Sequence, residues 1–141
     1  MRKFGAGPQG GRSYGPLNAA GDRQTAWVEG ARGDGIGQWL MIRWDSEQVF
    51  QTLWINNGYG RAARIYRGNN RVARARITTS DGITLDVTLL DQNEKQRIRL
   101  PRRAKARWVR ITIGSVYRGN RWRDTAIGGF RADLEELNNT R

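Results

Sequence analysis

The chain has 141 residues, with 25 lysines and arginines against 13 aspartates and glutamates, and it contains no cysteine and no histidine. The length suits one domain with a single core, and the two missing residue types exclude disulfides, thiolate metal sites, the usual zinc ligand and every histidine-containing catalytic triad. The net charge of +12 comes almost entirely from arginine, which indicates either a polyanionic partner or a solvated, arginine-biased surface.

The composition along the chain predicts a flexible lead-in over residues 1–13, one domain over 14–133 and a short tail over 134–141. Short runs of period-two alternation, bounded by Gly, Asn and Asp, are typical of a β-sandwich. We therefore predict an all-β jelly-roll β-sandwich of about eight antiparallel strands. The predicted strands are Thr25–Gly30, Gln38–Trp44, Gln48–Asn56, Val72–Thr79, Ile83–Leu90, Gln96–Leu100, Arg107–Gly114 and Thr125–Asp133. Helical turns are expected only near Ala62–Tyr66 and Leu134–Leu137.

The alternation also predicts which side chains face the core. The inward positions are Leu40, Ile42, Trp44, Val49, Leu53, Ile55, Ile83, Leu85, Val87, Leu89, Ile98, Leu100, Val109, Ile111 and Ile113. Four of the six tryptophans lie within strands and are interpreted first as packing residues, namely Trp39, Trp44, Trp54 and Trp108.

The connections between the predicted strands fall into two kinds. Residues 45–47, 80–82 and 101–105 form short turns, whereas 31–37, 57–71 and 115–124 are longer and rich in Gly, Tyr, Asn and Arg. In an antiparallel sandwich every second connection lies at the same end. The long loops, together with Asp91–Lys95, are therefore expected at one end and the short turns at the other. Variable loops gathered on a rigid scaffold are where binding sites usually lie.

Two of the long loops contain similar sequences. Residues 66–71 read Tyr-Arg-Gly-Asn-Asn-Arg, and residues 117–121 read Tyr-Arg-Gly-Asn-Arg. We interpret this echo as two turns that solve the same backbone problem, with Gly and Asn supplying left-handed conformations. A single echo is too little to indicate a repeat architecture.

A series of motifs carries a resemblance to a known family. In chain order these are Tyr14–Asn18, Asp22–Gly30, Gly33–Trp39, Asn57–Tyr59, Asn70–Arg71, Val116–Tyr117 and Asp124–Ile127. From about Tyr14 to Phe130 the chain resembles the discoidin-like (coagulation factor 5/8 type C) domains of the galactose-binding-like superfamily. The similarity is greatest to a bacterial branch, the NADase-type glycan-binding domains. The runs Thr25–Gly30 and Gly33–Gly37 are specific in combination.

The resemblance implies a jelly roll that binds glycans through loops at one end. It does not imply NAD hydrolysis, because in that family the catalytic domain is a separate module. Related domains often hold a structural calcium through two acidic positions, which here are Ala20 and Gly129. Because neither position is acidic here, no cofactor is expected, and Asp22 and Thr25 remain as weak calcium candidates.

A sugar site needs an aromatic face for C–H surfaces and planar polar groups for hydroxyls. The long-loop end and the strongest family motifs supply both. The candidate ligand-binding residues are Glu29, Asp34, Asn57, Tyr59, Tyr66, Asn70, Arg71, Tyr117, Trp122, Arg123 and Asp124. Ordinary turn composition is the alternative interpretation: Tyr66 and Tyr117 would close the sandwich, Glu29 would pair with Arg71 or Arg123, and Asp34 would form a turn.

The favoured function is a non-catalytic glycan-binding module, with the excess arginine indicating acidic or sulfated glycans. The alternatives are a basic β-sandwich that binds nucleic acid or another polyanion, and a protein-interaction or targeting module of a secreted assembly. The densest basic run, residues 101–107, is interpreted as a solvated turn. A carboxylate enzyme that uses Glu29, Asp34 or Asp124 is the least favoured reading.

Location follows less directly from the sequence. No stretch approaches the roughly 20 apolar residues of a membrane helix, so membrane insertion is not expected. Met-Arg-Lys at the start is not followed by the apolar core of a signal peptide. A secreted or cell-surface bacterial module is expected from the resemblance, and a cytoplasmic location also stays open.

Overall fold

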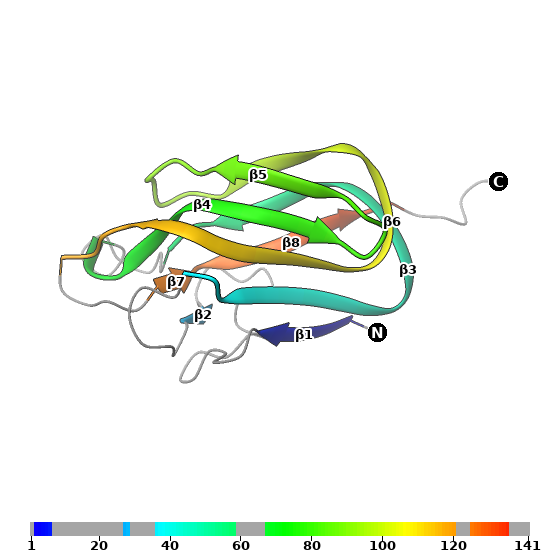
Figure 1. Ribbon diagram of the computed structural model, residues 1–141, viewed down its shortest axis with the longest axis horizontal. Helices are drawn as coiled ribbons and strands as arrows, with labels where there is room; N and C mark the ends of the chain where they lie inside the picture. Colours follow the sequence, from blue (N-terminus) through cyan, green and yellow to red (C-terminus); the bar gives the residue numbers. More distant parts are fainter. Residues whose placement is uncertain (1, 7–26, 29–35, 59–66, 121–124, 136–141) are drawn as a thin grey trace.

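The computed structural model describes residues 2–6, 27–28, 36–58, 67–120 and 125–135. Almost all regular structure in this part of the chain is β-strand, which confirms the all-β prediction (Figure 1). The strands are β1 (Arg2–Ala6), β2 (Trp27–Val28), β3 (Trp39–Asn56), β4 (Asn70–Thr79), β5 (Thr84–Thr88), β6 (Gln96–Tyr117), β7 (Thr125–Ile127) and β8 (Gly129–Leu134).

The strands form two layers, which are joined because β3 and β6 each bend and cross from one layer to the other (Figure 1). The front layer has the order β5–β4–β6–β3–β1 and uses the second part of β6 and the first part of β3. The back layer pairs the first part of β6 with the second part of β3 and then with β8. These pairs are antiparallel, as predicted, whereas β4 and β7 pair in parallel.

Two predicted turns are wrong, because residues 45–47 and 101–105 lie inside β3 and β6. The register between the two strands shifts after Arg43 and again after Phe50, and pairing continues between these shifts. Such bulges bend a strand sharply without ending it. Each bend reverses the chain direction as a turn would, so the strand ends still alternate between the two ends of the sandwich as predicted.

The last predicted strand, Thr125–Asp133, is divided at Gly128 into β7 and β8. A Cβ at Gly128 would lie 2.2 Å from the carbonyl oxygen of Gly58, and the Gly128 N–H donates to the Asn56 carbonyl at 2.8 Å. The close approach of two backbones therefore requires glycine there. Strand β1, which lies in the predicted lead-in, was not predicted. The expected helical turn near Ala62–Tyr66 falls outside the described residues.

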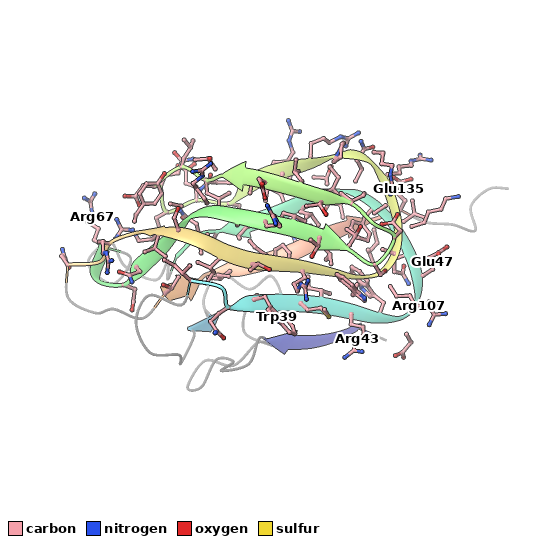
Figure 2. All side chains as sticks on the ribbon, in the orientation of Figure 1. Trp39, Arg43, Glu47, Arg67, Arg107 and Glu135 are labelled. Atoms are coloured by element: carbon pink, nitrogen blue, oxygen red, sulfur yellow. The ribbon has the colours of Figure 1, made fainter. Side chains whose placement is uncertain are left out.

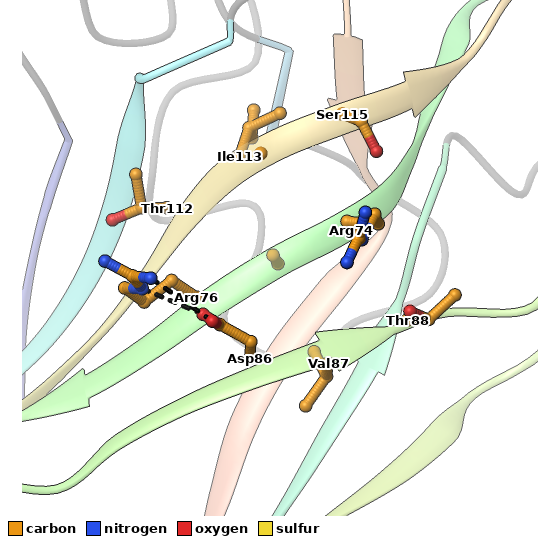
Figure 3. Close-up of a pocket in the computed structure, with 10 residues that line it drawn as sticks. Arg74, Arg76, Asp86, Val87, Thr88, Thr112, Ile113 and Ser115 are labelled. Carbon is orange, nitrogen blue, oxygen red and sulfur yellow. Dashed lines mark hydrogen bonds and ion pairs between the residues drawn. The ribbon is translucent and has the colours of Figure 1, made fainter.

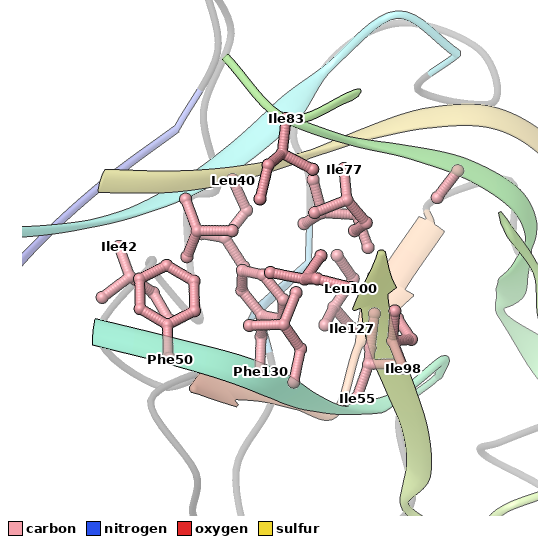
Figure 4. Close-up of a cluster of buried hydrophobic side chains, with 14 of the residues drawn as sticks. Leu40, Ile42, Phe50, Ile55, Ile77, Ile83, Ile98, Leu100, Ile127 and Phe130 are labelled. Atoms are coloured by element: carbon pink, nitrogen blue, oxygen red, sulfur yellow. The ribbon is translucent and has the colours of Figure 1, made fainter. Parts of the chain in front are cut away.

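The core lies between the two layers (Figure 4). Strands of both layers contribute large buried side chains, among them Leu40, Ile42, Phe50, Leu53, Ile55, Ile77, Leu100, Ile111, Ile113, Ile127 and Phe130. Trp44 packs at the bend of β3 with its ring 5.4 Å from that of Phe50. The predicted inward positions are confirmed, with Leu85 and Val87 at the margin, where they are partly buried.

Candidate functional site

The described parts of the connections 57–71, 91–95 and 115–124 lie at one end of the sandwich, on the left in Figure 1, as predicted, whereas most of the connection 31–37 lies outside the described residues. Hydrogen bonds join the described residues there: Val72 N–H donates to the Asn57 carbonyl, the Asn57 amide to the Leu90 carbonyl, and Asn120 N–H to the Arg67 carbonyl. The two bends and the β4–β5 turn lie at the opposite end. Figure 2 shows Arg67 at the loop end and Glu47, Arg107 and Glu135 at the bend end.

Arg71 is the residue that ties the loop end together. Its side chain is only 9% exposed, and its Nε and Nη2 donate to the two carboxylate oxygens of Asp91 at 3.0 and 2.8 Å. Its Nη1 donates to the carbonyl oxygens of Arg67, Asn69 and Arg118 at 3.1, 3.0 and 3.3 Å. One guanidinium, with its planar fork of donors, therefore links three connections in a fixed arrangement.

The two echo segments pack directly against each other. The Gly119 N–H donates to Asn70 Oδ1 at 2.7 Å, and the Asn120 N–H donates to the Arg67 carbonyl at 3.0 Å. A Cβ on Gly119 would lie 2.3 Å from the Gly68 carbonyl oxygen. Glycine is thus required by close approach. The predicted left-handed conformations are wrong for Gly119 and Asn120, since the described residues with positive φ are Gly37 and Gly82.

Two further side chains fasten the same end. Asn57 is fully buried, and its amide donates to the carbonyl oxygens of Val72 at 3.0 Å and Leu90 at 2.8 Å. The Tyr117 hydroxyl donates to the Leu89 carbonyl at 2.7 Å, which connects the end of β6 to the end of β5. These bonds tie the start of β4, the residues after β5 and the end of β6 to one another.

The predicted site residues therefore separate into three groups. Asn57, Asn70 and Arg71 are buried, with hydrogen bonds inside the chain, while Tyr117 is partly exposed. The others lie outside the described residues, namely Glu29, Asp34, Tyr59, Tyr66, Trp122, Arg123 and Asp124. Tyr117, Asn70 and Arg71 do share one end, as the sequence argument required. Ligand contact by any of these residues stays a prediction.

Sequence reasoning missed Asp91, which was placed at the loop end but given no role. No local pattern in the sequence pairs Asp91 with Arg71; the pairing follows only once the guanidinium of Arg71 is seen to be buried, since a buried charge needs a partner. Leu90, just before Asp91, was also missed: it exposes 61% of its surface. A large apolar side chain in contact with solvent beside polar loops is suited to packing against a ligand.

No cluster of three or more metal-binding side chains occurs among the described residues. The calcium candidates Asp22 and Thr25 lie outside them, and Gly129, where an acidic residue would be required, carries no side-chain oxygen. Whether the domain holds a metal therefore stays a prediction. That same part contains no helix long and apolar enough to span a membrane.

Two acids with lowered pKa values, Asp81 and Asp86, lie away from the loop end. Burial raises the pKa of Asp81, but hydrogen bonds from the Thr79 hydroxyl, the Lys105 N–H and Arg102 outweigh it, so the pKa is lowered. On the front layer a hydrogen bond from Arg76 lowers the pKa of Asp86, and Asp86 in turn raises the pKa of Arg76. Neither acid is poised near neutral pH for proton transfer.

Comparison with known proteins places this fold. The family 32 carbohydrate-binding module from Clostridium perfringens NanJ, in complex with galactose, superposes with a TM-score of 0.71 and 16% identity over 95% of this chain and 93% of that chain. A module from a family 31 glycoside hydrolase of Clostridium perfringens gives 0.70 and 19%, over 93% and 92%. The module of AlyQ, in complex with 4,5-unsaturated mannuronic acid, gives 0.65 and 14%, over 97% and 99%. No curated protein matches the chain.

The layers, the bent strands and the single loop end thus define a discoidin-like jelly roll of the type seen in carbohydrate-binding modules. More specifically, the model of one family matches residues 7–131, and the chain belongs to that family: NAD glycohydrolase translocation F5/8 type C domains. This confirms the resemblance drawn from the sequence motifs.

Proposed function

We propose that the domain is a non-catalytic glycan-binding module whose ligand contacts the loop end. The observation that carries this proposal is the set of hydrogen bonds from Arg71 to Asp91 and to the Arg118 carbonyl. These bonds fix three connections relative to one another before any ligand binds. Preorganised loops lower the ordering cost of binding. The resemblance to family 32 modules, one of them in complex with galactose, supports a sugar as the ligand class.

The exposed groups of the loop end match what a sugar requires. Tyr117 offers part of an aromatic ring, Leu90 an apolar surface, and Arg67 and Asn120 exposed polar side chains. The predicted contacts from Tyr59, Tyr66, Trp122, Arg123 and Asp124, and from Glu29 and Asp34, would complete the site. A single shallow site of this kind binds in the range of roughly micromolar to millimolar, and several copies would raise the avidity.

Titration calorimetry with galactose and with mannuronate oligosaccharides tests the site through Tyr117. In Tyr117→Phe the ring is kept and only the bond to the Leu89 carbonyl is lost, so we expect affinity within about threefold of wild type. In Tyr117→Ala the stacking face is lost, and we expect about a tenfold loss, equivalent to about 1.4 kcal/mol.

Trp108→Ala is the matched control, because Trp108 is a partly exposed aromatic residue beside the bend of β6, at the other end of the sandwich. We expect it to bind sugar like the wild type. Thermal melting of each variant separates loss of binding from loss of fold. Equal losses for Trp108→Ala and Tyr117→Ala would rule out the loop end, and a glycan array with no signal would overturn the proposed function itself.

The family points to bacterial domains that act outside the cell, and we propose a secreted or cell-surface setting for this one. A glycan-binding module in that setting would have access to the glycans displayed outside the cell. Fractionation of cells expressing the full-length gene, followed by detection of this domain in the medium or on the surface, tests the setting; recovery only from the cytoplasm would contradict it.

A further inference from the structure

The outer face of the front layer contains an open groove of about 380 Å³, separate from the loop end (Figure 3). Strands β4, β5 and β6 form its floor. Its polar lining consists of Arg74, Arg76, Asp86, Thr88, Thr112 and Ser115. Gly114 leaves room in the floor, where a Cβ would lie 3.2 Å from the Arg74 carbonyl oxygen. None of the candidate ligand-binding residues of the loop end lines this groove.

The groove is part of a strongly basic face. Alternation and register place Arg43, Arg74, Arg76 and Arg110 outward on the front layer. Among the described residues that point outward from Trp39–Arg43, β4, β5 and 108–115, the single carboxylate is Asp86. Asp86 accepts from Arg76 Nε and Nη2 at 2.8 and 3.2 Å. This face therefore carries one carboxylate and four guanidinium groups, and its net charge is positive.

Arg74 is the arginine of the groove whose guanidinium N–H groups are available to a ligand. It is exposed, lies at the bulge where β4 meets Ser115, and makes no side-chain hydrogen bond within the described part of the chain. The hydroxyls of Thr88 and Ser115 stand on the two strands that flank it. A guanidinium between hydroxyl groups matches a ligand that carries both anionic groups and hydroxyls.

Arg110 extends the basic face toward β3. Its guanidinium carbon lies 5.3 Å from the ring centroid of Trp39 and 5.5 Å from that of Trp108. Both rings are only partly exposed and already hold a cation on one face. Sequence-independent binding of single-stranded nucleic acid relies on open aromatic faces for base stacking, and the groove itself contains no aromatic side chain.

We propose that this groove binds an internal stretch of a linear anionic polysaccharide, with Arg74 contacting its sulfate or carboxylate groups and the threonine and serine hydroxyls contacting the sugar. The groove is open at the surface, so a chain can pass along it without presenting an end. This site goes beyond the proposed function, since it lies on a sheet face and does not need the loop end to be occupied.

A heparin-derived dodecasaccharide is the probe, with binding measured by calorimetry at about 50 and 200 mM salt. Arg74→Glu is expected to weaken binding at least tenfold. Arg97→Glu is the matched control: Arg97 is also an exposed strand arginine without a side-chain hydrogen bond in the described residues, but it lies on the back layer opposite Trp54. We expect a loss of at most about threefold there. Equal losses would mean general charge attraction and would overturn the site.

A second pair of variants tests the same site through a change that should strengthen binding. Asp86→Asn removes the acid that occupies Arg76, so we expect severalfold tighter binding of the dodecasaccharide. Asp133→Asn removes an acid from the back layer, where Asp133 contacts Trp54 and Arg131, and should leave affinity nearly unchanged. Tightening of similar size in both variants would also overturn the proposal.

Two further titrations separate this site from its alternatives. Single-stranded DNA of matched charge should bind more weakly than the dodecasaccharide and should not depend on Arg74; tighter, Arg74-dependent binding would assign the groove to nucleic acid instead. Galactose binding should be intact in Arg74→Glu. If the wild type bound galactose but did not bind the dodecasaccharide, the groove would not be a polysaccharide site, and the proposed function at the loop end would be unaffected.

Discussion

Asp81 accepts hydrogen bonds from three residues at the bend end. The Thr79 hydroxyl, the Lys105 N–H at 2.9 Å and Arg102 Nη1 at 2.9 Å all point at its carboxylate. The carboxylate therefore connects the β4–β5 turn to the bend of β6. Hydrogen bonds to charged groups are stronger than those between neutral groups.

We expect Asp81→Asn to lower the free energy of unfolding by about 1–2 kcal/mol at pH 7. Because the pKa of Asp81 in the folded state is below its ordinary value of 3.8, its stabilisation is complete above that value and is lost as the pH falls through the folded pKa. The difference from the wild type should therefore shrink by pH 2.5. Urea unfolding at both pH values measures it.

Asp86→Asn is the control for this prediction, since Asp86 also has a lowered pKa but lies in a pair exposed to solvent. Because exposed ion pairs contribute little to stability, the free energy of unfolding of Asp86→Asn should stay close to that of the wild type. A constant difference between Asp81→Asn and the wild type across the pH range would show that the charge of Asp81 is not what stabilises the bend.

At the scale of elements, the loop end depends on the contact between the two echo segments. In Gly119→Ala the new methyl group would lie 2.3 Å from the Gly68 carbonyl oxygen and 2.5 Å from the Asn69 carbonyl carbon. These are backbone atoms, so the segments must separate. We expect a loss of about 1–3 kcal/mol in unfolding free energy and faster exchange of the Asn120 amide hydrogen.

Asn120→Ala is the matched control, because the Asn120 side chain is exposed and its contact with Arg67 runs through the backbone N–H. Its stability and amide exchange should match the wild type. If Gly119→Ala also matched the wild type, the close packing of the two segments would not be what holds the loop end together.

The same elements show how far the sequence could be read. The inward positions of β3 and β6 were predictable because burial on one face leaves a period of two. Residues 45–47 and 101–105 appeared as turns because polar residues and Pro101 interrupt that period. Whether such an interruption ends a strand or bends it depends on pairing with a distant partner, which a local pattern does not contain.

For the candidate site, the sequence predicted a location better than it predicted roles. Parity alone brought Arg71, Asn70 and Tyr117 to one end. It could not show that Arg71 is buried with Asp91, because that pair joins two loops 20 residues apart. The groove was also beyond its reach: the residues that line it lie on three strands and meet only through the register.

At the scale of the whole molecule, we predict that sugar binding does not require a divalent cation. The described residues provide no acidic cluster for one, and the position where an acid would be needed is Gly129. Galactose affinity and the melting temperature should be the same after dialysis against EDTA as before. A fall in either that calcium restores would assign a metal site to residues outside the described ranges, such as Asp22 and Thr25.

The bent strands β3 and β6 have a consequence for how the domain unfolds. Each strand supplies hydrogen bonds to both layers, so neither layer can come apart while the other stays intact. Loss of structure should therefore be a single concerted event, with the tryptophan fluorescence and the far-ultraviolet circular dichroism changing together. Assembly must join segments that are distant along the chain, and this domain should accordingly refold slowly for its size.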